Sequence, residues 1–345
     1  MKPLGLLKIM KTPYFILDTK KLTKNYQDLD NICKKILKNY QICYSVKTNS
    51  LPEVIKTLAK ENSGFEIASL NEIKLIPKNK FTIFNSCCKT QEELKLAIKN
   101  KFLINIDNKQ EIDKLSALLK NKKFEIGLRV SIKDSKFGIP INKLKQIALY
   151  ASSKNLKINC LHFHQGTQIS LESYQKNLKT FAQLLKKLNL KPKYIDIGGG
   201  FPSKPQLKNL NVNISDYLLT IKKYFPNSII ILEPGRYLVS DTMSLITKVH
   251  YIKENFNKKY AILDTGINIL PKITLARYKF EQINKKPNKK SEFILAGPLL
   301  FSNDILGRFV GNLEQGDLIK ISNVGAYCYN LAWEISYKKP KVLIK

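Results

Sequence analysis

The sequence predicts a closed barrel of eight parallel strands and surrounding helices, followed by a smaller, mostly β domain. Two observations support this prediction. Short apolar, β-branched segments alternate with segments of helical periodicity from about residue 40 to residue 235, and eight such apolar segments occur. Alternating strands and helices are typical of a parallel sheet, and eight units are typical of a (β/α)₈ barrel.

The predicted strands are apolar at their centres and end in small or polar residues. They are residues 40–46, 64–69, 81–86, 102–107, 124–130, 158–164, 194–200 and 229–235. Helical periodicity, with apolar residues three and four positions apart, marks residues 51–61, 90–100, 108–120, 141–154 and 170–188. We therefore expect the barrel domain to cover residues 21–245.

The pattern changes after residue 245. Short strands separated by turn residues follow, without convincing helical periodicity, so residues 246–345 are expected to form a mostly β domain. The segment "TPYFILD", residues 12–18, alternates clearly and precedes the barrel. Residues 1–20 are therefore expected to add an N-terminal strand to the β domain.

Composition narrows the class of protein. The chain has 345 residues, no apolar run near the roughly 20 residues that a membrane-spanning helix needs, and no signal-peptide pattern. We expect a cytoplasmic protein without membrane association. Six cysteines without paired spacing and only three histidines argue against a disulfide framework and a metal site.

The net charge of +32 raises the question of nucleic-acid binding. Only four of the 59 basic residues are arginine, and the lysines are spread along helix-like segments. Nucleic-acid interfaces prefer clustered arginine, so no specific nucleic-acid binding is expected. Attraction to an acidic protein partner stays open.

Functional residues of such barrels lie where the strands end. The strand ends of this chain hold Lys47, Glu66 with Ser69, Asn85, Asp107, Arg129, His164 with Thr167, Gly198–Gly200, and Glu233 with Arg236. Two basic groups, a histidine, a glycine-rich turn and a glutamate at one mouth predict a binding site for an anionic, partly aromatic ligand.

Six motifs in order give the chain a family resemblance: "YSVKTN", "GFEIAS", "HFHQGTQ", "IDIGGGF", "EPGR" and "GAY". The chain resembles the fold-type III pyridoxal-phosphate decarboxylases, which include diaminopimelate and ornithine decarboxylases and share their architecture with alanine racemase. The resemblance runs from about Thr12 to Lys345. It implies pyridoxal 5'-phosphate (PLP) as cofactor, an α-amino acid as substrate, and a homodimer with shared active sites.

The resemblance also implies roles around the cofactor. Lys47 matches the lysine that forms the Schiff base with PLP, and partial desolvation at a strand end favours the neutral amine that this reaction needs. His164 matches the histidine that stacks on the cofactor ring. Glu66 and Arg129 are grouped with the cofactor-binding residues.

The phosphate of the cofactor is expected to meet backbone N–H groups and three side chains. Gly198, Gly199 and Gly200 form a turn without Cβ atoms, which suits an anion. By resemblance, Arg236 and Tyr327 are further phosphate contacts, and Thr167 stands where relatives usually have serine.

Glu233 bears on the type of reaction. A carboxylate about 4 Å from the pyridine nitrogen, at an effective dielectric of about 20, favours the protonated ring by about 4 kcal/mol before desolvation is subtracted. A protonated ring is the stronger electron sink. Alanine racemase has arginine at this place, so decarboxylation is favoured, and a PLP-dependent racemase or epimerase is the alternative.

The segment "GPLLFSND" departs from the family pattern. Leu300 and Phe301 replace a cysteine and an acidic residue that relatives supply across the dimer interface. The acid that protonates the carbanion after decarboxylation is therefore not assigned, and the candidates are Lys47, Cys328, Tyr327 and water.

The same departure leaves the substrate open. A pocket without the acidic residue is less suited to a distal ammonium group, so a modified amino acid, or one tethered to an acidic carrier protein, is an alternative substrate. Arg277 is a candidate for binding a substrate carboxylate, with a surface role as its alternative. Asp304 is a candidate for ordering backbone near the substrate, with a turn role as its alternative. A non-catalytic regulator is the third hypothesis.

Overall fold

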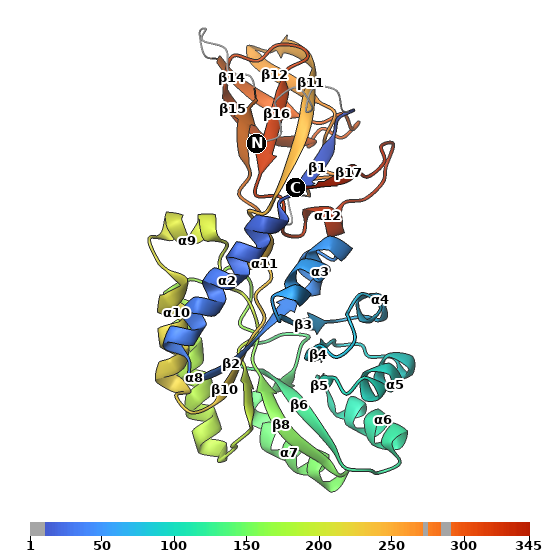
Figure 1. Ribbon diagram of the computed structural model, residues 1–345, viewed down its shortest axis with the longest axis vertical. Helices are drawn as coiled ribbons and strands as arrows, with labels where there is room; N and C mark the ends of the chain where they lie inside the picture. Colours follow the sequence, from blue (N-terminus) through green and yellow to red (C-terminus); the bar gives the residue numbers. More distant parts are fainter. Residues whose placement is uncertain (1–10, 272–274, 284–290) are drawn as a thin grey trace. The chain divides into compact units, whose positions relative to one another are not determined.

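The structure is a computed structural model that describes residues 11–271, 275–283 and 291–345 (Figure 1). The chain divides into a unit of residues Leu22–Leu238 and a second unit formed by the chain before and after it. The first unit is a closed parallel barrel and the second is mostly β, so the predicted fold class is confirmed. The second unit begins at Val239 instead of residue 246, because the long strand β11 (Met243–Asn255) belongs to its sheet.

Eight strands close the barrel. They are β2 (Asn39–Ser45), β3 (Gly64–Ile67), β4 (Thr82–Asn85), β5 (Leu103–Ile106), β6 (Phe124–Ser131), β8 (Leu156–His162), β9 (Tyr194–Asp196) and β10 (Ile229–Leu232). Each is parallel to the next, and β10 pairs with β2 to complete the circle. The short β7 (Ile139–Pro140) pairs with the end of β6. All parallel strands end at the same rim, which is why residues far apart in sequence meet there.

The five helices expected from periodicity all form. The helices of this part of the chain are α2 (Thr19–Ile36), α3 (Pro52–Lys60), α4 (Leu70–Ile73), α5 (Gln91–Lys99), α6 (Lys109–Leu119), α7 (Leu144–Ser153), α8 (Leu171–Leu188), α9 (Lys204–Leu210), α10 (Ile214–Tyr224) and α11 (Arg236–Val239). Side-chain caps fix several starts. Thr90 accepts from Glu93 N at 3.2 Å, and Glu93 Oε2 accepts from Thr90 N at 2.8 Å, which is a capping box.

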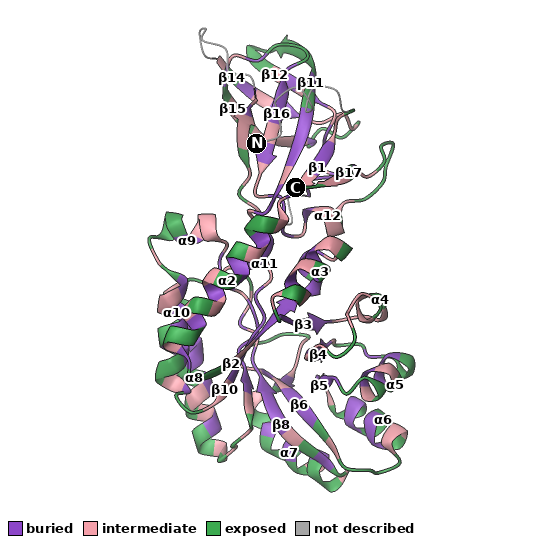
Figure 2. Ribbon diagram, in the orientation of Figure 1, coloured by how far each residue is buried: buried purple, intermediate pink, exposed green. Residues whose placement is uncertain are grey.

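The barrel strands are buried along most of their length (Figure 2). Cys43, Ile83, Leu103, Cys160 and Ile231 come from five strands and form an apolar cluster. Polar residues are also buried on these strands, and they concentrate toward the strand ends, where Asn85, Asn105 and Asp196 are at most 5% exposed. Buried polar groups are costly unless they are hydrogen-bonded, so this end of the barrel is built for more than packing.

The second unit is a β structure that joins both ends of the chain. Its strands are β1 (Tyr14–Leu17), β11, β12 (Lys258–Leu263), β13 (Lys279–Gln282), β14 (Ser291–Ala296), β15 (Ile305–Gly311), β16 (Leu318–Ser322) and β17 (Lys341–Ile344), with the short helix α12 (Cys328–Leu331). Strand β1 pairs antiparallel with β11 and parallel with β17. Among the described helices, none has both the length and the apolar character that a bilayer span requires.

A buried ion pair fixes the loops at the barrel mouth. Lys89 Nζ donates to Ser86 O at 2.6 Å, to Asn105 O at 2.8 Å, and to Glu111 Oε1 and Oε2 at 3.2 and 3.0 Å. Glu111 also accepts from Asp107 N at 2.9 Å. The two side chains are at most 5% exposed. This pair therefore ties the segment after β4 to the end of β5 and to the start of α6.

Replacing Lys89 with Met should lower the free energy of unfolding by about 3 kcal/mol, because Glu111 is left as a buried charge without its partner. Chemical denaturation of the purified protein measures this change. Lys157→Met is the matched control. Its ion pair with Glu125, at 3.2 Å, is more than half exposed on both sides and should contribute less than about 1 kcal/mol. Equal losses in the two variants would contradict the structural role of Lys89.

Candidate active site

Lys47 lies just beyond β2, in a single 3₁₀ turn formed by Val46–Thr48. Its Nζ donates to Glu66 Oε2 at 2.6 Å, and Ser45 Oγ donates to the same oxygen at 2.6 Å. The Lys47 side chain is 44% exposed, whereas Glu66 is 1% exposed. Lys47 is thus less desolvated than the sequence suggested. An ion pair with a buried carboxylate, more than burial, holds its amine at the strand end.

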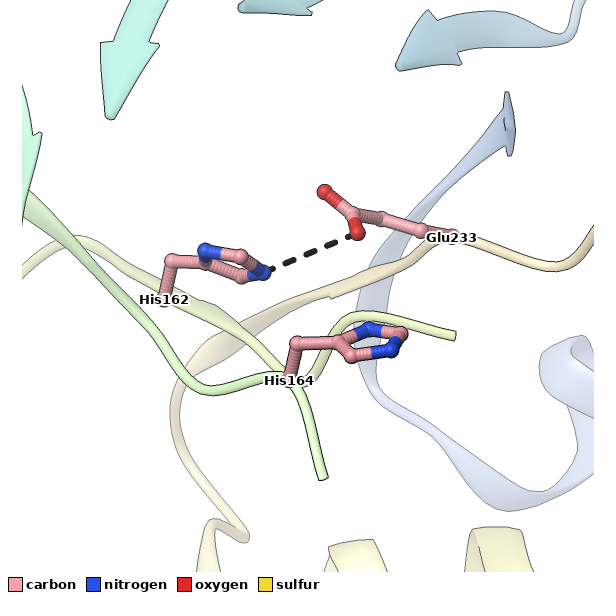
Figure 3. Close-up of side chains that lie close together, drawn as sticks. All are labelled: His162, His164 and Glu233. Atoms are coloured by element: carbon pink, nitrogen blue, oxygen red, sulfur yellow. Dashed lines mark ion pairs between the residues drawn. The ribbon is translucent and has the colours of Figure 1, made fainter. Parts of the chain in front are cut away.

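Glu233 follows β10 and is 3% exposed. Asn85 Nδ2 donates to its Oε1 at 2.6 Å, and His162 Nε2 lies 3.6 Å from its Oε2 (Figure 3). The second distance is that of an ion pair and is too long for a hydrogen bond. Burial raises the pKa of Glu233, but the charges of His162 and Lys47 outweigh burial and lower the pKa below its ordinary value. The Glu233 carboxyl is therefore ionised at neutral pH.

Asp196, at the end of β9, is fully buried close to Glu233. Its Oδ1 accepts from Gly198 N at 2.9 Å, and its Oδ2 accepts from Asn105 Nδ2 at 3.3 Å. Burial, followed by the negative charge of Glu233, raises the pKa of Asp196 well above its ordinary value. The pKa values of two neighbouring acids are thus shifted in opposite directions, that of Glu233 downward and that of Asp196 upward.

His164 carries a neutral ring at the same mouth. Gly199 N donates to His164 Nδ1 at 3.3 Å, which leaves the ring proton on Nε2. Burial, followed by the positive charge of Lys47, lowers the pKa of His164 to about 3. The ring centroids of His164 and His162 lie 6.4 Å apart, and Figure 3 shows both rings near the Glu233 carboxylate. A flat, neutral imidazole suits stacking on another aromatic ring.

The glycine turn after β9 is shaped by close backbone approach. Gly198 and Gly200 have φ of +67° and +85°, and a Cβ on Gly199 would lie 2.4 Å from the carbonyl oxygen of Glu233. No larger residue fits these positions without displacing the mouth. Asp196 and His164 accept the N–H groups of Gly198 and Gly199. These two N–H groups are therefore used within the protein, and the phosphate contact of the turn stays a prediction.

Three other predicted residues lie in the barrel unit. Arg129, on β6, has Nη1 3.8 Å from Asp107 Oδ1, and its guanidinium carbon lies 4.5 Å from the Phe137 ring centroid. Burial and the Lys47 charge lower the pKa of His164 most, and the positive charge of Arg129 is a smaller cause. Arg129 therefore lies near His164 at the barrel mouth. Thr167 is exposed in the loop after β8. Arg236 begins α11 and is 7% exposed.

The remaining predicted residues belong to the β unit. Tyr327 precedes α12 with φ of +65°, and Arg277 is exposed. Leu300 is fully exposed and Phe301 is 45% exposed. Asp304 is buried and accepts from the backbone N–H groups of Ile267 and Leu299 at 2.7 and 2.8 Å, which gives it a structural role in its loop. Cofactor or substrate contacts of these residues stay predictions.

His162, His164 and Glu233 also form a cluster of ligand-type atoms, all within 4.8 Å of one another. Two imidazoles and a carboxylate are a combination that a divalent metal accepts. However, the resemblance assigns His164 and Glu233 to the cofactor ring. A metal bound by these three side chains would occupy the position expected for the cofactor ring. We therefore do not treat the cluster as a metal site distinct from the cofactor site.

Comparison with known proteins decides the family. Residues 24–240, which include Lys47, His164, Asp196 and Glu233, match the family model described as "Pyridoxal-dependent decarboxylase, pyridoxal binding domain". This chain belongs to the pyridoxal-dependent decarboxylases. The family resemblance drawn from the six motifs is therefore confirmed, as is PLP as the cofactor.

The relatives of this decarboxylase align over most of their length. Diaminopimelate decarboxylase of Aquifex aeolicus is 28% identical over 87% of this chain and 79% of the relative. Lysine/ornithine decarboxylase of Selenomonas ruminantium is 26% identical over 93% of this chain and 86% of the relative. A structure of Helicobacter pylori diaminopimelate decarboxylase complexed with L-lysine has a TM-score of 0.89 at 26% identity, covering 99% of this chain and 93% of that one.

Sequence reasoning missed three polar residues of the site: Ser45, Asn105 and Asp196. Each lies within or at the end of an apolar strand, in "QICYS", "LINI" and "YID". A polar residue on an otherwise buried strand is a usable signal, because it needs a hydrogen-bond partner inside the barrel. The partner itself comes from another strand and is visible only in the structure.

In the cofactor-free protein, the His164 ring should stay neutral from pH 8 down to about pH 4, as measured by NMR of its ring carbons. Its pKa falls from 6.5 unfolded to about 3 folded, so below pH 6.5 the unfolded chain binds a proton that the folded chain does not. This group therefore lowers the free energy of unfolding as the pH falls from 6.5 to 3, by at most about 1.4 kcal/mol per pH unit. A ring that titrates near pH 6.5 would contradict the assignment.

Proposed function

We propose that this pyridoxal-dependent decarboxylase removes the α-carboxylate of a diaminopimelate-type amino acid, with Lys47, His164 and Glu233 as catalytic residues. The observation that carries the proposal is the ionised, buried Glu233 at the same mouth as the Lys47 amine and the neutral His164 ring. When bound, PLP supplies the electron sink that stabilises the charge left on the α-carbon.

The residues fit this cofactor. The Lys47 amine is the nucleophile for its aldehyde carbon, and the glycine turn Gly198–Gly200 offers a Cβ-free cradle for its phosphate. The Glu233 carboxylate would face the ring nitrogen and keep it protonated. The neutral His164 ring stacks without adding a positive charge that would oppose this protonation.

Glu66 is placed to accept a proton from the Lys47 amine. Lys47 must lose a proton before its nitrogen attacks a carbonyl carbon. Glu66 Oε2 lies 2.6 Å from Nζ, within the distance of direct proton transfer, and is 1% exposed. Glu66 can therefore accept this proton next to the nitrogen and return it later.

Two substrate classes compete. The relatives named diaminopimelate decarboxylase support meso-diaminopimelate as the first candidate. The exposed apolar pair Leu300 and Phe301 supports the second, an amino acid whose distal end is modified or tethered to an acidic carrier protein. An apolar pair has no charge to offer a distal ammonium group.

Mass spectrometry of the products separates these substrates. The PLP-loaded protein is incubated with meso-diaminopimelate, lysine, ornithine, arginine and glutamate in deuterated buffer. Lysine formed from diaminopimelate is the expected result, and it would show that Leu300 and Phe301 are compatible with a free amino acid. Deuterium at Cα without loss of carbon dioxide would instead support a racemase or epimerase. An intact cofactor band with no reaction would favour the modified or carrier-bound substrate.

A homodimer is part of the proposal. Apolar side chains of the β unit, Leu300, Phe301, Trp333 and Tyr337, are between 41% and 102% exposed, and such residues suit a subunit contact. Sedimentation should give twice the chain mass.

For an acidic carrier protein, the net charge of +32 predicts binding that is strong at low salt and lost at high salt.

Replacing Lys47 with Ala should abolish the visible absorption band of the PLP-loaded protein, because the linking nitrogen is removed. Lys56→Ala, at an exposed position of α3, is the matched control and should keep the band. Glu233→Gln should also keep the band and lower kcat roughly 100-fold or more, because the charge that protonates the ring is lost. An unchanged band in Lys47→Ala would overturn the cofactor assignment.

A further inference from the structure

A chain of four polar side chains crosses the barrel interior. Asn85 Nδ2 donates to Glu233 Oε1 at 2.6 Å, Asn105 Nδ2 donates to Asn85 Oδ1 at 2.8 Å, and Asn105 Nδ2 also lies 3.3 Å from Asp196 Oδ2. The four residues are between 0% and 5% exposed. They come from β4, β5, β9 and the end of β10, so the chain joins four strands.

The direction of these hydrogen bonds is fixed by the chemistry of the groups. An amide has a donor end and an acceptor end, whereas an ionised carboxylate only accepts. Because Asn85 Oδ1 receives the Asn105 amide, the Asn85 Nδ2 group must face Glu233. A flipped Asn85 would place its oxygen against the carboxylate and its NH₂ group against the NH₂ group of Asn105, so both contacts would be lost.

Gly127 makes room for this chain. A Cβ on Gly127, in β6, would lie 1.7 Å from Asn105 Oδ1. Any other residue there would displace the Asn105 amide. The backbone oxygen of Asn105 is held as well, because it accepts from Lys89 Nζ at 2.8 Å. The backbone of Asn105 is therefore held by Lys89, and the space beside Gly127 admits its amide, which donates to Asn85.

We propose that Asn85 is a positioning residue, oriented by Asn105, that holds the Glu233 carboxylate in the plane and ionisation state needed to pair with the cofactor ring nitrogen. This inference rests on the proposed function, in which Glu233 faces that nitrogen. Neither asparagine is proposed to touch the substrate, and both act through Glu233.

Asp196 completes the arrangement. Burial and the negative charge of Glu233 raise the pKa of Asp196, which disfavours a second negative charge beside Glu233. Glu233 receives the short hydrogen bond from Asn85 and lies 3.6 Å from His162 Nε2. A hydrogen bond to an ionised acceptor is stronger than one to a neutral acceptor, so the Asn85 amide favours the charged form of Glu233.

Binding of two cofactor forms tests the proposal without relying on catalysis. The probes are PLP and its carbocyclic analogue, in which C–H replaces the ring nitrogen. The native protein should bind PLP at least about tenfold more tightly than the analogue, because only PLP has a ring N–H for Glu233. In Asn85→Leu, which keeps the side-chain size, the ratio should fall to within about threefold.

Asn159→Leu is the matched control. Asn159 is also a buried barrel asparagine, and its Nδ2 donates to Glu125 Oε2 at 2.6 Å, but it lies in the middle of its strand and does not contact Glu233 in the described hydrogen bonds. This variant should keep the native ratio. If Asn85→Leu does not fold, Asn85→Ala and Asn105→Leu take its place, since each removes an amide donor without adding an ionisable group and should also reduce the ratio.

The outcomes are distinct. A native ratio in a folded Asn85 variant would overturn the positioning role while leaving the decarboxylase assignment untouched. No preference in the native protein would overturn the pairing of Glu233 with the ring nitrogen, and the positioning role with it. Failure of the proposed function would appear elsewhere, as the absence of a Lys47-dependent visible band or of any decarboxylated product.

Discussion

The site depends on one constraint: Glu233 keeps a negative charge inside a barrel from which water is largely excluded. An unpaired buried carboxylate would take up a proton, so the surroundings must stabilise its charge. The Asn85 amide, the His162 ring and the Lys47 ammonium supply this stabilisation. The raised pKa of Asp196 disfavours a second negative charge in the same interior.

The two carboxylates Glu66 and Glu233 at the barrel mouth have different partners. Glu66 is held against Lys47 and Ser45 and is placed for the proton of the nucleophile. Glu233 receives the Asn85 amide and, in the proposed function, faces the ring nitrogen of the cofactor. His164 stays neutral, because burial and the Lys47 charge oppose its protonation. The two carboxylates thus have different partners, Lys47 and Ser45 for Glu66, and Asn85 and His162 for Glu233.

The departures from the family pattern that the sequence shows lie in the β unit, at Leu300 and Phe301. The barrel unit matches the family's pyridoxal binding domain and contains Lys47, His164 and Glu233. Buried Asp304 keeps the shape of the substituted loop through its backbone hydrogen bonds.

The sequence by itself determined the barrel, its eight strands and the residues at their ends, because periodicity and strand-terminal chemistry are local properties. The motifs around Lys47, His164 and Glu233 could be found for the same reason. Only the tertiary structure decided the charge states and the hydrogen-bond partners. Asn105 and Asp196 are ordinary polar residues in the sequence, and they acquire a role only when the closed barrel brings β5 and β9 within reach of Glu233. Such contacts join residues more than 100 positions apart, so no local pattern encodes them.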